Sequence, residues 1–322
     1  MSDVFLSNEV LIYLFSETVL YILLCIAFIY TIDLIRHWDF RRFDEQQFLL
    51  EKRAYLVMSV TLFVFMVKII ITPYFTFTVD NLAVLIPGAM CAAGVVAANE
   101  FGYPLLYLKI AILFATGSWI IINKLDLKAT TYPYFKIKSW LFVIVFTLIS
   151  VEFFLNYSYF EAIETSAPVS CCSAIYTAQS GGNTLPLGLD ITKLLTLFYL
   201  LFGLTIISNI NRYDSLHVIA NILFLMVSYY AVIYFFGTYV YEIPTHQCPF
   251  CMLQSEYHYM GYLIWISLLL GTFFGINSSA LQLLLNKEMK SVYNISLIFN
   301  LLFVFTCSLY VALFYFNNGV FL

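Results

Sequence analysis

Residues 82–98 read LAVLIPGAMCAAGVVAA, and this stretch decides how the rest of the chain crosses a membrane. It is apolar, but it is short, rich in small residues and interrupted by Pro87-Gly88. A spanning helix needs about 20 mostly apolar residues. Backbone at membrane depth must be hydrogen-bonded or sheltered by protein, and small residues allow close packing. The segment is therefore either a re-entrant half-helix or a ninth span.

The composition places the whole chain in a membrane. Hydrophobic residues make up 62% of it and charged residues 11%, with a mean hydropathy of +0.89. Soluble domains carry roughly 45–50% apolar and about 25% charged residues. No polar stretch is long enough for a soluble domain. We therefore expect an all-α polytopic protein, with residues 1–322 as a single domain in the lipid bilayer.

The positions of the basic residues favour the re-entrant interpretation. If 82–98 does not cross, 12 of the 15 Lys and Arg residues lie in loops on one side, which the positive-inside rule makes the inner side. If it crosses, this asymmetry collapses. We predict both termini outside, outer loops at 161–190 and 242–256, and a bacterial inner-membrane location. The eight expected spans are 11–35, 54–78, 104–123, 139–160, 191–210, 216–240, 257–284 and 294–317.

The second of these outer loops contains a Cys-X-X-Cys pair. Residues 244–259 read PTHQCPFCMLQSEYHY. Pro249 suits a first helical turn, so we expect span seven to begin there with Cys248 at its N-cap. A helix N-terminus and Cys-X-X-Cys spacing both favour a reactive thiolate. Cys248 and Cys251 are therefore candidates for disulfide exchange. With His246 and Met252 they also suit Cu(I), and a structural disulfide is a third alternative.

The motif CPFCMLQSEYHYMGY resembles the first redox motif of the DsbB family of quinone-linked, disulfide-generating membrane enzymes. The vitamin K epoxide reductase family has a similar pair at the outer end of a span. The resemblance covers about fifteen residues. It implies redox roles for Cys248 and Cys251 and quinone contact near Gln254. The chain has Ser255 where the DsbB family has Arg, and those enzymes are four-helix bundles.

Further cysteines fall on the same predicted side. Cys171 and Cys172 are adjacent in the longest outer loop, where a strained vicinal disulfide would be labile. Two dithiols on one face suit an exchange relay. They also suit a cuprous cage completed by Met90 and Cys91. Two structural disulfides would explain the same cysteines.

Four ionisable residues lie inside predicted spans, namely Glu17, Lys68, Lys109 and Glu152. Such groups are costly in a bilayer and usually face a partner. We expect acid–base pairing among them. The functional alternative is a proton path or a polar group at a quinone pocket, with Lys109 as a cofactor contact. His217 stands alone near a helix end and is expected at the interface.

Several functions lack their sequence signals. There is no phosphate-binding Gly-Lys-Ser/Thr run, no dinucleotide fingerprint and no haem-attachment motif, because Met252 follows Cys251. Nucleic-acid binding has no support. The leading hypothesis is a thiol–disulfide oxidoreductase that exchanges disulfides with an extracytoplasmic thioredoxin-like protein and passes electrons to quinone. The alternatives are a Cu(I)-binding protein that serves a metal-receiving partner, and an accessory subunit with structural disulfides.

Overall fold

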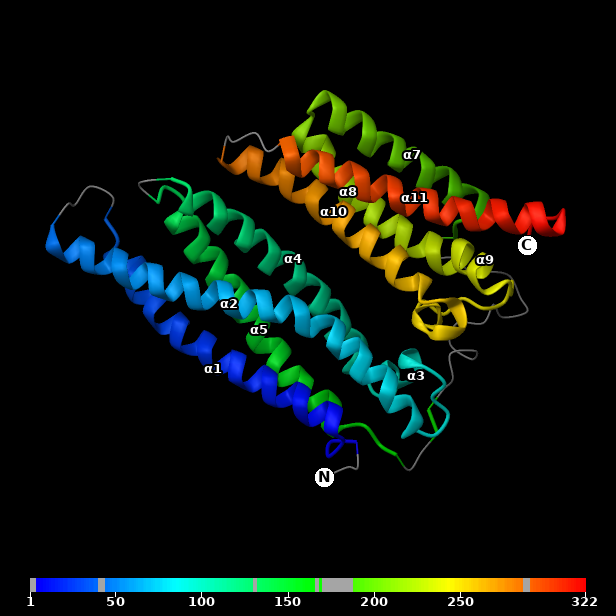
Figure 1. Ribbon diagram of the computed structural model, residues 1–322, viewed down its shortest axis with the longest axis horizontal. Coiled ribbons are helices and arrows are strands. Elements are labelled where there is room, and N and C mark those ends of the chain that lie inside the picture. The colour runs from blue at the N-terminus through cyan, green and yellow to red at the C-terminus, as the bar shows by residue number, and fades with distance from the viewer. Residues whose placement is uncertain (1–3, 40–43, 130–131, 166–167, 170–187, 286–289) are drawn as a thin grey trace. The chain divides into compact units, whose positions relative to one another are not determined.

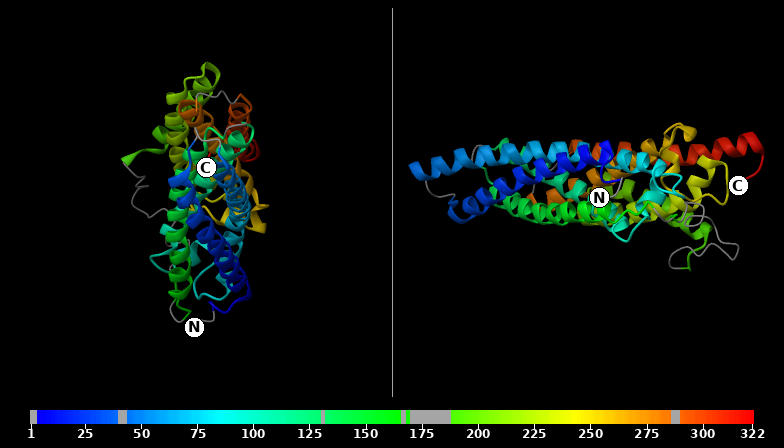
Figure 2. Two further views of the ribbon diagram at one scale, coloured as in Figure 1. Left: turned by 90° about the vertical axis from the view of Figure 1, so that its left-hand side faces the viewer. Right: turned by 90° about the horizontal axis from the view of Figure 1, so that it is seen from below.

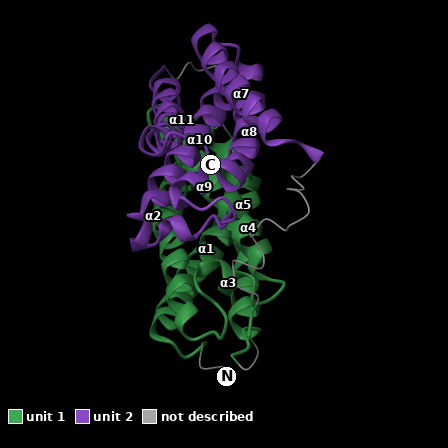
Figure 3. Cartoon of the chain, turned by 90° about the vertical axis from the view of Figure 1, so that its right-hand side faces the viewer, with its two compact units in different colours: residues 1–170 green, residues 171–322 purple. Residues whose placement is uncertain are grey.

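A computed structural model of the chain describes residues 4–39, 44–129, 132–165, 168–169, 188–285 and 290–322 (Figure 1). Within these ranges all regular secondary structure is helical, and eight helices are long and apolar enough to cross a bilayer. The prediction of an all-α, eight-span membrane protein is confirmed. The chain divides into two compact units, Met1–Ser170 and Cys171–Leu322 (Figure 3).

Unit 1 is a four-helix bundle. Helix α1 packs on α2 and α5, and α4 packs on the same two helices, which closes the ring (Figures 1 and 2). Aromatic side chains fill the middle, for example Phe65 edge-on against Trp119 with ring centroids 5.1 Å apart. The helices are α1 (Asn8–His37), α2 (Glu45–Asn81), α4 (Gly102–Leu127) and α5 (Phe135–Glu161).

Residues 82–98 do not form a ninth span. They hold only a three-residue 3-10 turn, η1 (Leu82–Val84), and a five-residue helix, α3 (Ala92–Val96). A five-residue helix is about 7.5 Å long, far shorter than a bilayer core. The charge asymmetry therefore led to the right choice between eight and nine spans. That both termini lie outside stays a prediction.

The neighbouring helices satisfy the backbone of this segment. Asp80 at the end of α2 accepts a hydrogen bond from the Ala92 amide at 3.0 Å. The Tyr159 hydroxyl of α5 donates to the Val95 carbonyl at 2.9 Å. Gly88 has φ +83°, a conformation that costs a residue with a side chain. The PGAMCAAG motif thus forms a sheltered turn within unit 1, as its Pro-Gly step suggests.

Unit 2 is a second four-helix bundle with the same cyclic order. Helix α7 packs on α8 and α11, and α10 packs on the same two (Figures 1 and 2). A π-helical turn, η3 (Val232–Phe236), joins α8 to the short α9 (Gly237–Tyr241), so that these elements form one continuous span. The other helices are α7 (Ile191–Asn211), α8 (Asp214–Ala231), α10 (Met260–Leu285) and α11 (Lys290–Asn318).

Glycines on α10 set how closely its neighbours approach. A Cβ added to Gly271 would lie 2.9 Å from the backbone nitrogen of Asn300, and one added to Gly275 would lie 2.6 Å from the Asn221 side-chain nitrogen. Small residues at helix contacts are a common packing device in bilayers, where lipid competes for apolar surface. The inner faces of α8, α10 and α11 therefore meet through these two positions.

We expect Gly271→Ala to destabilise the protein by roughly 1–3 kcal/mol, because the added methyl overpacks the contact with the Asn300 backbone. Gly203→Ala in α7 is the matched control, since nothing lies within 4 Å of its would-be Cβ. The control should be neutral or slightly stabilising. Unfolding in mixed micelles titrated with a denaturing detergent measures both. Equal effects of the two substitutions would contradict the packing account.

Candidate functional site

The Cys-X-X-Cys loop is anchored by Tyr241, the last residue of α9. Its hydroxyl donates to the Cys248 carbonyl and accepts from the Met252 amide at 3.0 Å. The chain reverses just after it, at Glu242, whose φ of 55° ends the helix. One phenol therefore holds both ends of the CPFC tetrapeptide, and the loop between Tyr241 and Met252 closes on its own starting helix.

The two sulfurs of the motif lie together. The Sγ atoms of Cys248 and Cys251 are within 4.8 Å of each other. Both side chains are buried, with exposed fractions of 1% and 8%. Cys251 opens a 3-10 turn, η4 (Cys251–Leu253), and this tight turn brings residues three apart onto one side. The sequence-predicted pair is thus a compact, buried dithiol site within unit 2.

Helix α10 clamps the loop from the other side. Trp265 Nε1 donates to the Pro249 carbonyl at 3.1 Å. Met252 is fully buried, and a Cβ on Gly261 would lie 2.8 Å from the Met252 backbone, so only glycine fits there. The backbone around both cysteines is therefore held by α9 and by α10.

The apolar run 257–284 matches the observed helix of span seven, but the start inferred from Pro249 is wrong. Helix α10 begins at Met260, not near Pro249, because a second 3-10 turn, η5 (Ser255–Tyr257), and two left-handed residues intervene. His258 and Tyr259 have φ of 53° and 56°, and two such residues in succession cannot continue a right-handed helix. Cys248 is thus no N-cap of a long helix, and the helix-dipole argument for its reactivity does not apply.

Aromatic groups surround the anchoring phenol. The rings of His246 and Tyr257 meet Tyr241 edge-on, with centroids 4.4 Å and 4.7 Å from its own. Burial, followed by the charge of a Cys251 thiolate, raises the pKa of the Tyr257 hydroxyl. The half-buried Gln254 follows the pair, and its backbone N–H donates to the Cys251 carbonyl at 3.0 Å.

The remaining candidate ligands are distributed differently. Cys91 is buried at the N-cap of α3, and Met90 beside it is 74% exposed, so their side chains have opposite surroundings. Both belong to unit 1, whereas His246, Met252 and the Cys-X-X-Cys pair belong to unit 2. Cys171 and Cys172 lie outside the described residues. Their predicted roles in a relay or a metal cage stay predictions.

The four intramembrane charges are paired, as predicted. Lys68 Nζ lies 2.5 Å from Glu17 Oε2 and 2.7 Å from Glu152 Oε2. Lys109 Nζ lies 2.6 Å from Glu152 Oε1. All four side chains are buried in the middle of unit 1, and their charges alternate along a chain from Glu17 to Lys109. This chain links α1, α2, α5 and α4 and is neutral overall.

Lys109 has further contacts in this cluster. Its ammonium donates to the Tyr13 hydroxyl at 2.6 Å and sits 4.3 Å from the centroid of the Phe75 ring. Tyr13 in turn donates to Asn156 Oδ1 at 3.0 Å. Glu152 and Tyr13 thus accept two of the ammonium's hydrogen bonds, and the Phe75 ring lies against it. These contacts favour a structural role for Lys109, in holding the helices of the bundle together, over a role in contacting quinone.

Unit 2 contains a buried polar network that the sequence analysis missed. His217 lies inside the bundle rather than at the interface, with Nδ1 hydrogen-bonded to Ser208 at 2.9 Å and Nε2 accepting from Asn221 at 3.2 Å. Asn300 donates onward to Asn221 Oδ1 at 3.2 Å. The available signal was three polar residues at the buried positions of apolar helices, which cannot stay unpaired in a bilayer.

The charge chain predicts a specific mutant cycle. Lys68→Met leaves two buried carboxylates without their shared lysine and should destabilise the protein by about 3 kcal/mol or more. Adding Glu17→Gln removes one stranded carboxylate and leaves the Glu152–Lys109 pair, so the double variant should recover at least about 1 kcal/mol. Detergent unfolding measures both, with the exposed Lys193→Met as control. A double variant no better than Lys68→Met would contradict the chain.

Loss of the Tyr241 anchor should expose the cysteine pair. In Tyr241→Phe two hydrogen bonds are lost, each worth about 1 kcal/mol, so the loop opens more often. We expect the reduced cysteines to react with N-ethylmaleimide roughly tenfold faster or more. Tyr257→Phe is the matched control, because its ring stays beside Tyr241 while the two anchoring bonds remain. Equal rates in the two variants would show that the phenol does not hold the loop.

The chain was also compared with known proteins. No protein-family model, curated protein or solved structure matches it. The chemistry of the Cys248–Cys251 site must therefore be argued from the residues and contacts described above.

Proposed function

We propose that this protein is a membrane thiol–disulfide oxidoreductase with Cys248 and Cys251 as its redox pair. The main support for this proposal is the geometry of the pair. The two sulfurs lie within 4.8 Å of each other on one tight turn, and the Tyr241 hydroxyl holds that turn. Cys-X-X-Cys spacing places a resolving thiol beside the attacking one. A second support is that unit 2 alone is a four-helix bundle, the size of the enzymes that its motif resembles.

The proposed reaction is a thiol–disulfide exchange with a partner, followed by oxidation of the cysteine pair by quinone. A thiolate of a reduced extracytoplasmic partner with a thioredoxin-like site attacks the Cys248–Cys251 disulfide and forms a mixed disulfide. The partner's second thiolate then attacks the partner's own sulfur in the mixed disulfide and displaces the bound cysteine of this chain. The partner leaves oxidised, and Cys248 and Cys251 are both thiols after protonation. A membrane quinone then accepts two electrons and two protons from the pair, which restores the disulfide and yields quinol. In a relay through Cys171 and Cys172, which lie outside the described residues, that pair would exchange with the partner and its thiolates would then attack the Cys248–Cys251 disulfide.

The burial of the pair suggests how exchange is controlled. Both sulfurs are covered, while Glu242 to Thr245 and Ser255 to Glu256 on either side are exposed. A partner that docks on these exposed flanks reaches the sulfurs only when the loop opens. The Tyr241 bonds thus protect the pair from small oxidants and leave it available to a partner that binds the loop.

A second candidate function is Cu(I) binding. Both cysteine side chains are buried, and the buried Met252 lies on the same turn. Thiolate and thioether ligands select Cu(I), and a cation would compensate buried thiolates. In this alternative the protein hands the metal to an exported partner. A third alternative, an accessory subunit with a structural disulfide, requires the pair to stay oxidised under all conditions.

Trapping of thiols in cells tests the proposed function. Cells are quenched in acid and labelled with a heavy maleimide, with the quinone pool held oxidised or reduced. We expect the fraction of oxidised Cys248–Cys251 to follow the state of the pool. Cys248→Ser and Cys251→Ser should each abolish the response. Cys307→Ser, which removes another buried cysteine of unit 2, should leave it unchanged.

Two outcomes would contradict the redox proposal. If the pair never changes state and the purified protein holds stoichiometric copper that is lost in both serine variants, the metal function is correct. If the pair stays oxidised throughout and no metal binds, the disulfide is structural.

A further inference from the structure

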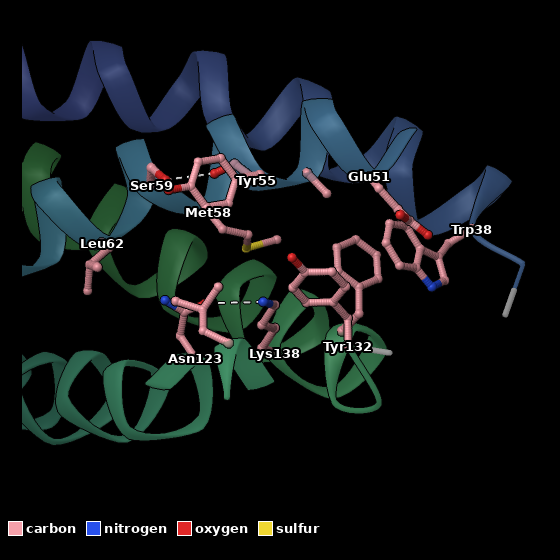
Figure 4. Close-up of a pocket in the computed structure, with 12 residues that line it drawn as sticks. Trp38, Glu51, Tyr55, Met58, Ser59, Leu62, Asn123, Tyr132 and Lys138 are labelled. Atoms are coloured by element: carbon pink, nitrogen blue, oxygen red, sulfur yellow. Dashed lines mark hydrogen bonds between the residues drawn. The ribbon is translucent and has the colours of Figure 1, made fainter. Parts of the chain in front are cut away.

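Unit 1 holds a cavity of about 140 Å³ at the end of the bundle where α1 and α4 finish and α2 and α5 begin (Figure 4). From its geometry we propose that this cavity is a binding site for one planar, neutral ring that carries a carbonyl oxygen, such as a quinone head group. The site consists of residues of unit 1 alone and is independent of the chemistry of Cys248 and Cys251.

The walls of the cavity are flat and aromatic. Trp38, just after α1, stacks on Phe135 of α5 with ring centroids 3.8 Å apart and planes 19° from parallel. Tyr55 of α2 and Tyr132 add two further rings to the lining. Offset or edge contacts with such rings stabilise another planar ring by about 0.5–1.5 kcal/mol beyond the area buried. Most of the lining is apolar, with Met58 of α2 closing one side.

A buried ammonium supplies the polar edge. Lys138 of α5 is fully covered, and its Nζ lies 2.6 Å from Asp126 Oδ2 and 3.1 Å from Asn123 Oδ1. An ammonium has three N–H donors, and these two partners account for two of them. Lys138 also lines the cavity, so its third donor can serve a carbonyl oxygen there. Asp126 already neutralises its charge, which favours a neutral ligand over an anion.

Tyr132 is held at the cavity by an unusual backbone. Its φ is 48°, a left-handed conformation that residues with side chains seldom adopt. Residues in such conformations cluster at binding and catalytic sites. The Lys138 Nζ lies 5.9 Å from the centroid of its ring, and Figure 4 shows the ring entering the cavity with its hydroxyl directed inward. The Lys138 ammonium and the Tyr132 hydroxyl thus offer two hydrogen-bond donors to the same part of the cavity.

The size and charge of the cavity define the ligand class. An apolar protein cavity of about 150 Å³ holds a benzene-sized molecule, so a similar volume accepts a single ring and little more. Glu51 on the lining adds a carboxylate that would repel an anionic ligand. A carboxylate-bearing aromatic is therefore disfavoured. A membrane quinone could leave its tail outside, and a small aromatic ketone would enter whole.

Equilibrium dialysis of the purified full chain in detergent, against a detergent-only blank, tests the site. The probe is 2,3,5,6-tetramethyl-1,4-benzoquinone, a single ring with no free position for thiol addition. 1,2,4,5-Tetramethylbenzene, which has the same ring and methyl groups but lacks carbonyls, and acetophenone, a small ketone, are the comparison ligands. We expect saturable binding of the quinone, with tetramethylbenzene at least about fivefold weaker because it cannot accept hydrogen bonds. Binding of acetophenone as tight as that of the quinone would assign the site to small ketones.

Two variants locate the binding. Ala54→Phe places a ring in the cavity and should abolish saturable binding. Tyr132→Phe keeps the volume and removes only the hydroxyl, and it should weaken binding about three- to tenfold even if Ala54→Phe fails to fold. Tyr230→Phe in α8 is the control and should bind as the unaltered protein does. Quinone binding that is absent, matched by tetramethylbenzene, or unchanged in Tyr132→Phe would overturn the proposal.

Discussion

The constraint on which this structure depends is that polar groups inside a bilayer must find partners within the protein. In unit 1 the constraint is met by a chain of four charges from Glu17 to Lys109, in which each inner residue serves two neighbours. In unit 2 it is met by His217 and the amides of Asn221 and Asn300. Each network joins helices that apolar packing alone would hold with little preference for register.

The same constraint shapes the irregular segments. Residues 82–98 and the CPFC loop form only short helical turns, and in each a tyrosine hydroxyl bonds to the backbone. Tyr159 donates to the Val95 carbonyl, and Tyr241 bridges Cys248 and Met252. Tyrosine suits this work because its ring packs in apolar surroundings while its hydroxyl serves the backbone. The cysteine pair is thus built into a loop whose backbone is hydrogen-bonded to Tyr241 at both ends.

Much of the fold followed from sequence, and the reasons are physical. Long apolar runs fix the spans, and basic residues fix which loops share a side, so residues 82–98 could be excluded as a ninth span. The cost of ionisable groups in a bilayer predicted acid–base pairing among Glu17, Lys68, Lys109 and Glu152, but not which lysine pairs with which glutamate. The division into two bundles was not foreseen. Its boundary falls within the loop 161–190, whose Ser-Gly-Gly-Asn run at 180–183 is a linker signal that was not used.

The site was predicted less completely. Cys-X-X-Cys spacing identified Cys248 and Cys251, but Pro249 misplaced the start of α10. The residues that delay that helix, His258 and Tyr259, adopt left-handed backbone without the glycine that would signal it. The anchor Tyr241 was not recognised, because one tyrosine among 25 has no distinguishing pattern. The cavity beside Lys138 depends on side chains from three helices and on Trp38 and Tyr132 outside them, which no local motif encodes.

The central claim is that Cys248 and Cys251 form a reversible two-electron couple. The most direct test is a titration of the purified protein in glutathione buffers, with mass spectrometry of the alkylated cysteines. The account predicts that both thiols change together, with a midpoint potential above about −300 mV, in the range of exchange-active pairs. A pair that stays oxidised below that potential, or two cysteines that titrate independently, would contradict it.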